Sequence, residues 1–127
     1  MRAIVCGGRD YTDGEHVFRT LDALRETMGL SHVIEGGQRR RNPQNHRVDG
    51  GADYWAMRWA KARRLTWDTV EADWTAHGRA AGPMRNARML AEFSPEIVIA
   101  FPGGSGTKDM SQRAERARLQ VLKIKAQ

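Results

Sequence analysis

The sequence predicts a three-layer α/β fold, in which helices cover both faces of a mostly parallel sheet of about five strands. Short apolar runs alternate along the chain with stretches of helical periodicity, and glycines follow several of these runs. Residues 97–101 form an unbroken apolar run, which is typical of a strand covered on both faces. Strands that alternate with helices favour a parallel sheet with right-handed crossovers.

The first half of the chain contains two strand-to-helix units. Residues 2–6 form a compact apolar strand, and Thr12 with Glu15 makes a capping box for a helix that ends at Gly29. Residues 32–35 form a second strand, which ends in two glycines. A second helix follows, and its apolar face consists of Ala52, Trp55, Ala56, Trp59 and Ala60.

The second half repeats this alternation. A third strand is expected at residues 66–70, and residues 72–81 are expected to be irregular. Gly82-Pro83 then begins a helix that runs to about Phe93, because proline is tolerated in a first turn. After the strand at 97–101 come a glycine-rich loop, one more helix and a last strand at residues 120–124.

Length and composition indicate one domain that includes residues 1–127. The formal charge of +6 favours phosphate-bearing partners, although the excess of arginine is weak evidence by itself.

No apolar run approaches the ~20 residues of a membrane span, so no membrane association is expected. The start of the chain reads as a strand rather than a signal peptide, and the lone Cys6 cannot form an internal disulfide, which together favour a cytoplasmic location. Cys6 itself is expected to be a buried, inert strand residue.

Residues 38–48 depart from the pattern. This segment has almost no apolar content and no periodicity, so an exposed basic loop is expected between the second strand and the second helix. Two interpretations of it stay open. Its four arginines close over additional phosphates of a ligand, or the loop is inert. The arginines are Arg39, Arg40, Arg41 and Arg47.

Two glycine loops mark the expected ligand site of this Rossmann-like arrangement. If the first and fourth strands are neighbours, the loops at residues 7–10 and 102–107 face each other at the carboxyl edge of the sheet, where ligands of open α/β folds bind. Glycines between a strand and a helix let the backbone approach an anion, while the helix amides face it. The two loops together therefore predict a phosphate site, although the glycines also suit tight turns.

Other side chains carry weaker signals. Arg85 and Asn86 lie in a first helical turn, where a cation gains nothing from the helix dipole unless a ligand phosphate is present. Asp53 suits a first-turn or N-cap acid and is also placed to hold a ribose hydroxyl. Trp74 and His77 are candidates for stacking on a base, against the commoner role of packing. The scattered histidines and single cysteine predict no metal site.

The chain resembles the SLOG superfamily of Rossmann-like nucleotide-binding domains, which includes DprA-like and LOG-like proteins. The resemblance is closest to its YspA-like branch of small bacterial and phage proteins, and it covers almost the whole chain. Five blocks in order carry it: Gly7-Gly8-Arg9-Asp10-Tyr11-Thr12-Asp13; Gly36-Gly37 with Gly51-Ala52-Asp53; Ala72-Asp73-Trp74 with His77-Gly78; Gly82-Pro83-Met84-Arg85-Asn86-Ala87-Arg88-Met89; and Phe101-Pro102-Gly103-Gly104-Ser105-Gly106-Thr107.

The resemblance implies roles for individual residues. It places Arg85 and Asn86 in the ligand site, the glycines before Thr107 around a phosphate, and a homodimer as the assembly. LOG-like enzymes carry a glutamate three residues after the motif threonine, but Met110 stands here, which leaves Arg85 and Asp109 as weak catalytic candidates. The expected ligand-binding residues are Gly7, Gly8, Arg9, Asp10, Gly37, Asp53, Arg85, Asn86, Met89, Pro102, Gly103, Gly104, Ser105, Gly106 and Thr107.

Three functions remain open at this point. The first is binding, by sensing or sequestration, of a nucleotide or a nucleotide-derived ligand such as an ADP-ribose-like molecule, with no cofactor required. The second is hydrolysis of the N-glycosidic bond of a nucleotide, with Asp10, Asp53 or Asp73 in place of the missing acid. The third is DprA-like binding of nucleic acid, which ranks last because no aromatic stacking platform is evident.

Overall fold

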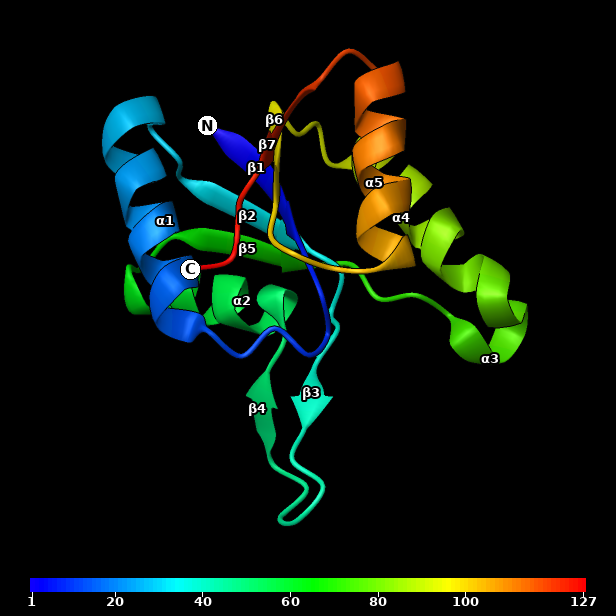
Figure 1. The fold of residues 1–127 in the computed structure, drawn as a ribbon. Coiled ribbons are helices and arrows are strands. Elements are labelled where there is room, and N and C mark those ends of the chain that lie inside the picture. The colour runs from blue at the N-terminus through cyan, green and yellow to red at the C-terminus, as the bar shows by residue number, and fades with distance from the viewer.

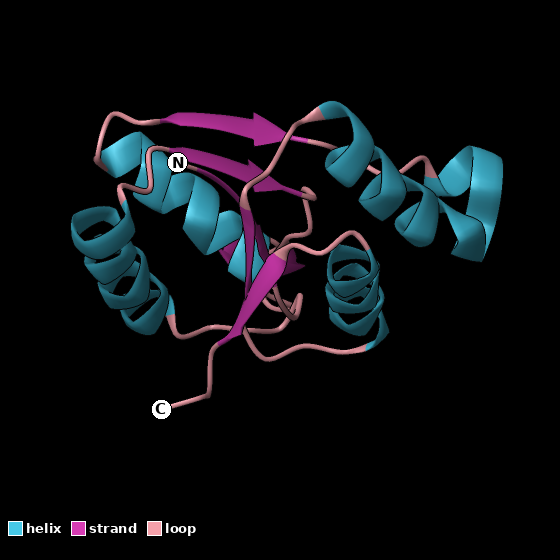
Figure 2. Ribbon diagram, turned by 90° about the horizontal axis from the view of Figure 1, so that it is seen from above, coloured by secondary structure: helices cyan, strands magenta, loops and turns pink.

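A computed structural model describes residues 1–127 and contains a five-stranded, entirely parallel sheet between two layers of helices (Figures 1 and 2). The strand order is β5-β2-β1-β6-β7, and each neighbouring pair is parallel. This arrangement confirms the predicted Rossmann-like α/β fold. The strands are β1 (Arg2–Cys6), β2 (His32–Glu35), β5 (Thr66–Thr69), β6 (Ile97–Ala100) and β7 (Gln120–Lys123).

Two separate apolar clusters fasten the helices to the sheet. The first lies between the sheet, α1 (Gly14–Met28) and α2 (Ala52–Ala62), and the second lies between the sheet, α4 (Ala81–Glu92) and α5 (Ser105–Arg116). Side chains of a strand alternate between its faces, so Ala3 and Val5 of β1 join the first cluster while Ile4 joins the second. None of the helices combines the length and the apolar character that crossing a membrane requires.

The expected adjacency of the first and fourth strands is confirmed, since β1 pairs with β6 from Ala3 opposite Ile97 to Cys6 opposite Ala100. The loops that follow these two strands therefore leave the sheet side by side. The amide of Gly8 donates a hydrogen bond of 2.8 Å to the carbonyl oxygen of Pro102. The two glycine loops thus form one continuous surface at the carboxyl edge of the sheet.

The basic segment is a β-hairpin rather than the irregular loop that the sequence predicted. Strands β3 (Arg40–Arg41) and β4 (Val48–Gly50) pair antiparallel, and Figure 1 shows them projecting away from the sheet and its helices. Arg40 donates to both carboxylate oxygens of Asp49 across the hairpin, each at 2.7 Å. An ion pair rather than apolar alternation joins the short strands, so the usual strand signal is absent.

Two helix boundaries also correct the predictions. The N-cap of α1 is Asp13, whose carboxylate accepts from the amide of His16 at 3.0 Å, so the Thr12 and Glu15 capping box is wrong by one position. The segment expected to be irregular contains α3 (Trp74–His77) and a 3₁₀ turn that leads into α4, which begins at Ala81. These short helical turns bury no side chain, so they lack the amphipathic pattern that predicts a helix.

Candidate functional site

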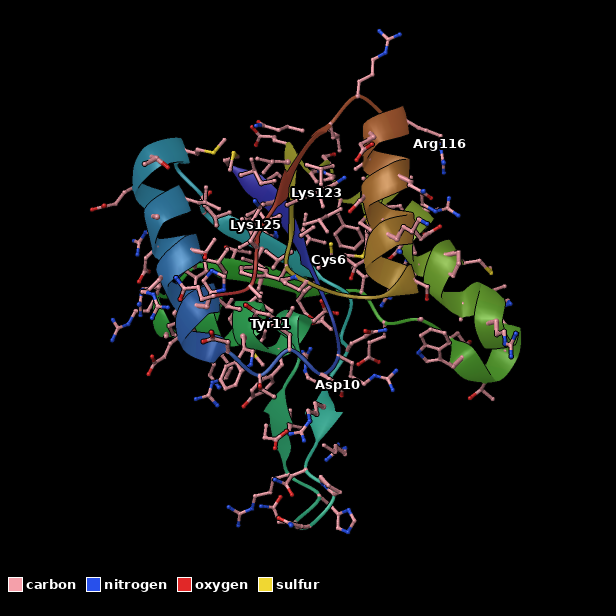
Figure 3. All side chains as sticks on the ribbon, in the orientation of Figure 1. Cys6, Asp10, Tyr11, Arg116, Lys123 and Lys125 are labelled. Carbon is pink, nitrogen blue, oxygen red and sulfur yellow. The ribbon has the colours of Figure 1, made fainter.

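A cavity of about 280 Å³ lies at the carboxyl edge of the sheet, between the loops after β1, β2 and β6. Figure 3 shows Cys6 at the end of β1, between the sheet and α5, with Asp10 and Tyr11 on the loop that follows. The cavity brings most of the predicted ligand-binding residues together. Those that line it are Gly7, Gly8, Arg9, Asp10, Asp53, Arg85, Asn86, Met89, Gly104, Ser105, Gly106 and Thr107.

The three remaining predicted residues lie next to this cavity rather than in its wall. Gly37 lines a neighbouring cavity that shares Arg9, Gly36 and Gln38 with the central one. Pro102 and Gly103 line two shallower hollows on the other side of the glycine loop. They shape the loop without facing the centre of the site.

Gly7 and Gly103 are required by close packing of the backbone. A Cβ at Gly7 would lie 2.6 Å from Cβ of Ala52 and 2.9 Å from Cβ of Phe101. A Cβ at Gly103 would collide with the hydroxyl of Thr107 and lie 2.7 Å from the amide nitrogen of Gly8. All three distances are far below van der Waals contact, so these glycines hold the two loops against each other and against α2.

Gly104 and Gly106 are different, because no close contact requires them to be glycines. A Cβ at either position would meet no atom within 4 Å, and neither residue has a positive φ. The first amides of a helix have no intrahelical partner, and Gly104, the N-cap of α5, supplies no side-chain acceptor for them. The open space beside these amides, at the positive end of the helix dipole, suits an anion.

Arg85 lies across the cavity from this helix end and is held by hydrogen bonds from two directions. Its Nη1 donates to the carbonyl of Gly36 at 2.5 Å, and its Nε donates to Oδ1 of Asn86 at 3.0 Å. The residue is only 7% exposed, yet Nη2 has no protein acceptor. Every fully buried side-chain nitrogen or oxygen in the protein has a hydrogen-bond partner. Because Nη2 has none, it is not fully buried, and it is the part of the guanidinium that opens onto the cavity.

Asn86 connects Arg85 to the start of α5. Its Nδ2 donates to the carbonyl of Gly106 at 3.2 Å and to Oδ2 of Asp109 at 3.0 Å. Asp109 also accepts from Nε of Arg113 at 2.9 Å and does not line the cavity. Asp109 therefore positions Asn86, and through it Arg85, rather than facing the space where a ligand fits.

Asp53 places a buried carboxyl group in the wall of the cavity. It lies in the first turn of α2, is 5% exposed, and accepts from the amide of Gln38 through Oδ2 at 3.1 Å. Burial, and then the nearby charge of Glu35, raises the pKa of Asp53 to about 7, against the opposing effects of the Gln38 amide, Arg85 and Arg39. Oδ1 has no protein partner and so reaches the cavity.

Glu35 is a component of the site that the sequence analysis missed. It ends β2, is fully buried, and accepts from the amide of Gly37 at 2.7 Å, from Arg39 at 3.0 and 3.2 Å, and from the hydroxyl of Thr69. A glutamate that ends a buried apolar strand directly before two glycines was a usable signal. With Asp53 and Arg85, it fixes the path of residues 36–39 along the cavity.

The remaining acids and the sulfur-containing residues have distinct positions. Asp10 is at the exposed rim, 4.0 Å from Nε of Arg40, and Asp73 caps α3 by accepting from Ala76.

Met110, at the position of the missing LOG acid, is buried and lines the cavity. Cys6 also lines it, and burial raises the pKa of its thiol, so the group is a neutral part of the wall.

Comparisons with known proteins identify the family of this chain. Residues 1–77 match the model of a family described as YspA, cpYpsA-related SLOG family. The chain belongs to this SLOG family. A similar protein, the Gene 61 protein of Mycobacterium phage D29, is 33% identical over 130 residues, which cover 95% of this chain and 94% of that protein. No solved structure matches the chain.

The matched residues do not cover the whole site of this SLOG protein. They include β1, β2, the hairpin and α2, and therefore Gly7, Glu35 and Asp53. Arg85 and the loop before α5 lie beyond residue 77. The geometry, rather than the family match, therefore assigns the second half of the cavity to the same site.

Proposed function

We propose that this SLOG protein binds a nucleotide or a nucleotide-derived ligand, with a phosphate group at the N-terminus of α5. One observation carries the proposal. Gly104 and Gly106 leave open space beside uncapped helix amides, in a cavity onto which the free Nη2 of Arg85 opens. Amides at a helix start and a guanidinium group are donors that suit phosphate oxygens. Membership in the SLOG family supports the same class of ligand.

The opposite wall suits the sugar of such a ligand. Asp53 offers an oxygen without a protein partner, which can accept a hydrogen bond from a ribose hydroxyl. Arg9 lies exposed at the rim and makes no ion pair, so it is free to approach a second phosphate. An ADP-ribose-like molecule combines these groups.

The experiment that tests the proposal is a binding titration with adenosine monophosphate, NAD and ADP-ribose, followed by thermal unfolding. A ligand at a hundredfold excess over its Kd should stabilise the protein by about 2.7 kcal/mol. Gly104→Asp should abolish this effect, because aspartate at an N-cap accepts the α5 amides itself and repels a phosphate. Gln112→Glu adds the same charge on the exposed side of α5, outside the cavity, and should bind as the unmodified protein does.

A second pair of variants separates the guanidinium group from net charge. Arg85→Gln should weaken binding of every phosphate-bearing ligand, whereas Arg88→Gln on the exposed face of α4 should leave it unchanged. The proposal fails if no phosphate-bearing compound stabilises the protein, or if Gly104→Asp and Arg85→Gln bind as well as their controls.

Hydrolysis of an N-glycosidic bond is a second candidate function, which the environment of Asp53 favours. A carboxyl with a pKa of about 7 is partly protonated at neutral pH and can donate its proton to a departing base. The bond from C1′ to the base nitrogen would break while Asp53 gives its proton to the base. Water oxygen would bond to C1′, and the proton that this water loses would return to Asp53. Free base released from nucleoside monophosphates, and lost in Asp53→Asn, would support this function; its absence would leave binding alone.

The hairpin gives less support to nucleic-acid binding. Arg39 pairs with Glu35 and Arg40 pairs with Asp49, which neutralises half of the arginines in the segment. Arg41 and Arg47 are the exposed cations that remain. A steep salt dependence of oligonucleotide binding, lost in an Arg41→Ala/Arg47→Ala variant, is the result that would revive this function.

A further inference from the structure

The central cavity adjoins a second cavity of the same volume, about 280 Å³, on the side of the sheet edge toward α3. The two cavities share Arg9, Gly36 and Gln38 in their walls. The second cavity is therefore within reach of a ligand that is larger than the first. The further wall of the second cavity includes Trp74.

Trp74 is the first residue of α3, and 48% of its surface is exposed. One edge of its ring lies against the start of α4, since a Cβ on Gly82 would come within 3.1 Å of Cη2 of the indole. The side chain of Asp73 caps α3 by accepting from the amide of Ala76 at 3.0 Å. The contact with Gly82 and the Asp73 cap thus fix the position of the Trp74 side chain, while much of its surface stays exposed beside the second cavity.

The other aromatic side chains near the site are already engaged. Tyr11 lines a hollow at the opposite rim, but its hydroxyl bonds to Nδ1 of His16 at 2.6 Å and its ring packs against Phe101 with centroids 5.7 Å apart. Tyr54 lies under Arg39 and Arg58 and lines neither cavity. His77, which the sequence analysis paired with Trp74, lines neither cavity either.

We infer that Trp74 is a stacking surface for the base of the ligand, and that this SLOG protein therefore recognises nucleotides with an aromatic base rather than phosphorylated sugars in general. The inference rests on the proposed phosphate site, because the phosphate at α5 determines which end of the ligand reaches Trp74. Base-to-aromatic stacking tolerates any base, since every base has a π face. The second cavity contributes affinity for the base, and Glu71 in its wall supplies a carboxylate that can accept from a base amino group.

The test compares a ligand that has a base with one that lacks it. Adenosine monophosphate, guanosine monophosphate and ribose 5-phosphate are titrated calorimetrically into the full chain and into Trp74→Ala, Trp74→Phe and Trp67→Ala. Trp67 is the matched control because it is a half-exposed tryptophan of the edge strand β5 that lines neither cavity. Trp74→Ala should weaken both nucleotides about tenfold and leave ribose 5-phosphate within about twofold, while Trp74→Phe should retain most of the affinity.

The outcomes separate this inference from the proposed function. Unchanged binding of ribose 5-phosphate shows that Trp74→Ala is folded and that its phosphate site is intact. If Trp74→Ala binds both nucleotides as tightly as Trp67→Ala does, while Gly104→Asp loses them, the phosphate site stands and the stacking inference is wrong. If the unmodified protein binds neither nucleotides nor ribose 5-phosphate, both the proposed function and this inference are overturned.

Discussion

The two walls of the cavity differ in how much of their chemistry the fold itself uses. In the wall formed by β1, β2 and α2, Gly7 is packed against Ala52 and Phe101, and Glu35 is surrounded by donors from Gly37, Arg39 and Thr69. In the wall formed by the start of α5, a Cβ at Gly104 or Gly106 would meet no atom, and no side chain caps the helix amides. Packing and hydrogen bonds within the fold therefore use most of the first wall, whereas the amides at the start of α5 are left without side-chain partners.

Adjacent glycines make the difference plain. Gly103 could not carry a side chain without displacing Thr107 and Gly8, whereas Gly104, the next residue, has free space around it. The same residue type serves backbone packing in one position and leaves open space in the other, where we propose that the phosphate binds. Substitutions in the first wall should therefore change the free energy of unfolding, and substitutions in the second should change binding.

The largest expected effect is in the first wall, at Glu35. Glu35→Ala removes the acceptor for Gly37 and leaves Arg39 half-buried without its partner, so the free energy of unfolding should fall by about 3 to 5 kcal/mol. Urea unfolding of Glu35→Ala and of the unmodified protein measures this loss of stability. Glu92→Ala, which breaks the exposed pair with Arg88, should cost less than about 1 kcal/mol. Equal losses in the two variants would show that the wall around Glu35 is not specially stabilising.

Asp53 should behave oppositely, since its charge destabilises the wall that contains it. Its folded-state pKa of about 7 is above the ordinary value of 3.8, so its stabilising contribution is complete below pH 4 and is lost as pH rises to about 7. Asp53→Asn should therefore raise the free energy of unfolding at pH 8 by roughly 4 kcal/mol and change it little at pH 4. Urea titrations of both proteins at several pH values measure the difference, and a pH-independent difference would contradict this account.

Gly7→Ala should have the next largest effect. The new methyl group would press on Ala52 and Phe101, and overpacking of this kind costs about 1 to 3 kcal/mol. Thermal unfolding should show a Tm lower by several degrees. A Tm equal to that of the unmodified protein would mean that the loops after β1 and β6 separate easily, and that the first wall is as open as the second.

Local sequence patterns predicted most of the fold. The apolar runs of β1 and β2 follow from the burial of these strands, and the glycine at the end of α1 follows from the left-handed backbone there. The hairpin and α3 escaped prediction since their short elements depend on ion pairs and caps rather than on periodic apolar residues.

The site was predictable to a similar degree. The glycine loops and Arg85 stand out in the sequence, whereas the contrast between Gly103 and Gly104 depends on neighbours that are distant in the chain. The raised pKa of Asp53 likewise arises from burial and from Glu35, which only the folded structure brings together.

The most direct test of the difference between the walls is Gly106→Ala, measured for both stability and binding of adenosine monophosphate. Gly106 lies in the first turn of α5 with free space for a methyl group, so alanine should raise the free energy of unfolding by about 0.5 kcal/mol through its helix propensity. The same methyl group should obstruct the phosphate and weaken nucleotide binding. A loss of stability like that of Gly7→Ala, or unchanged binding of the nucleotide, would contradict the account.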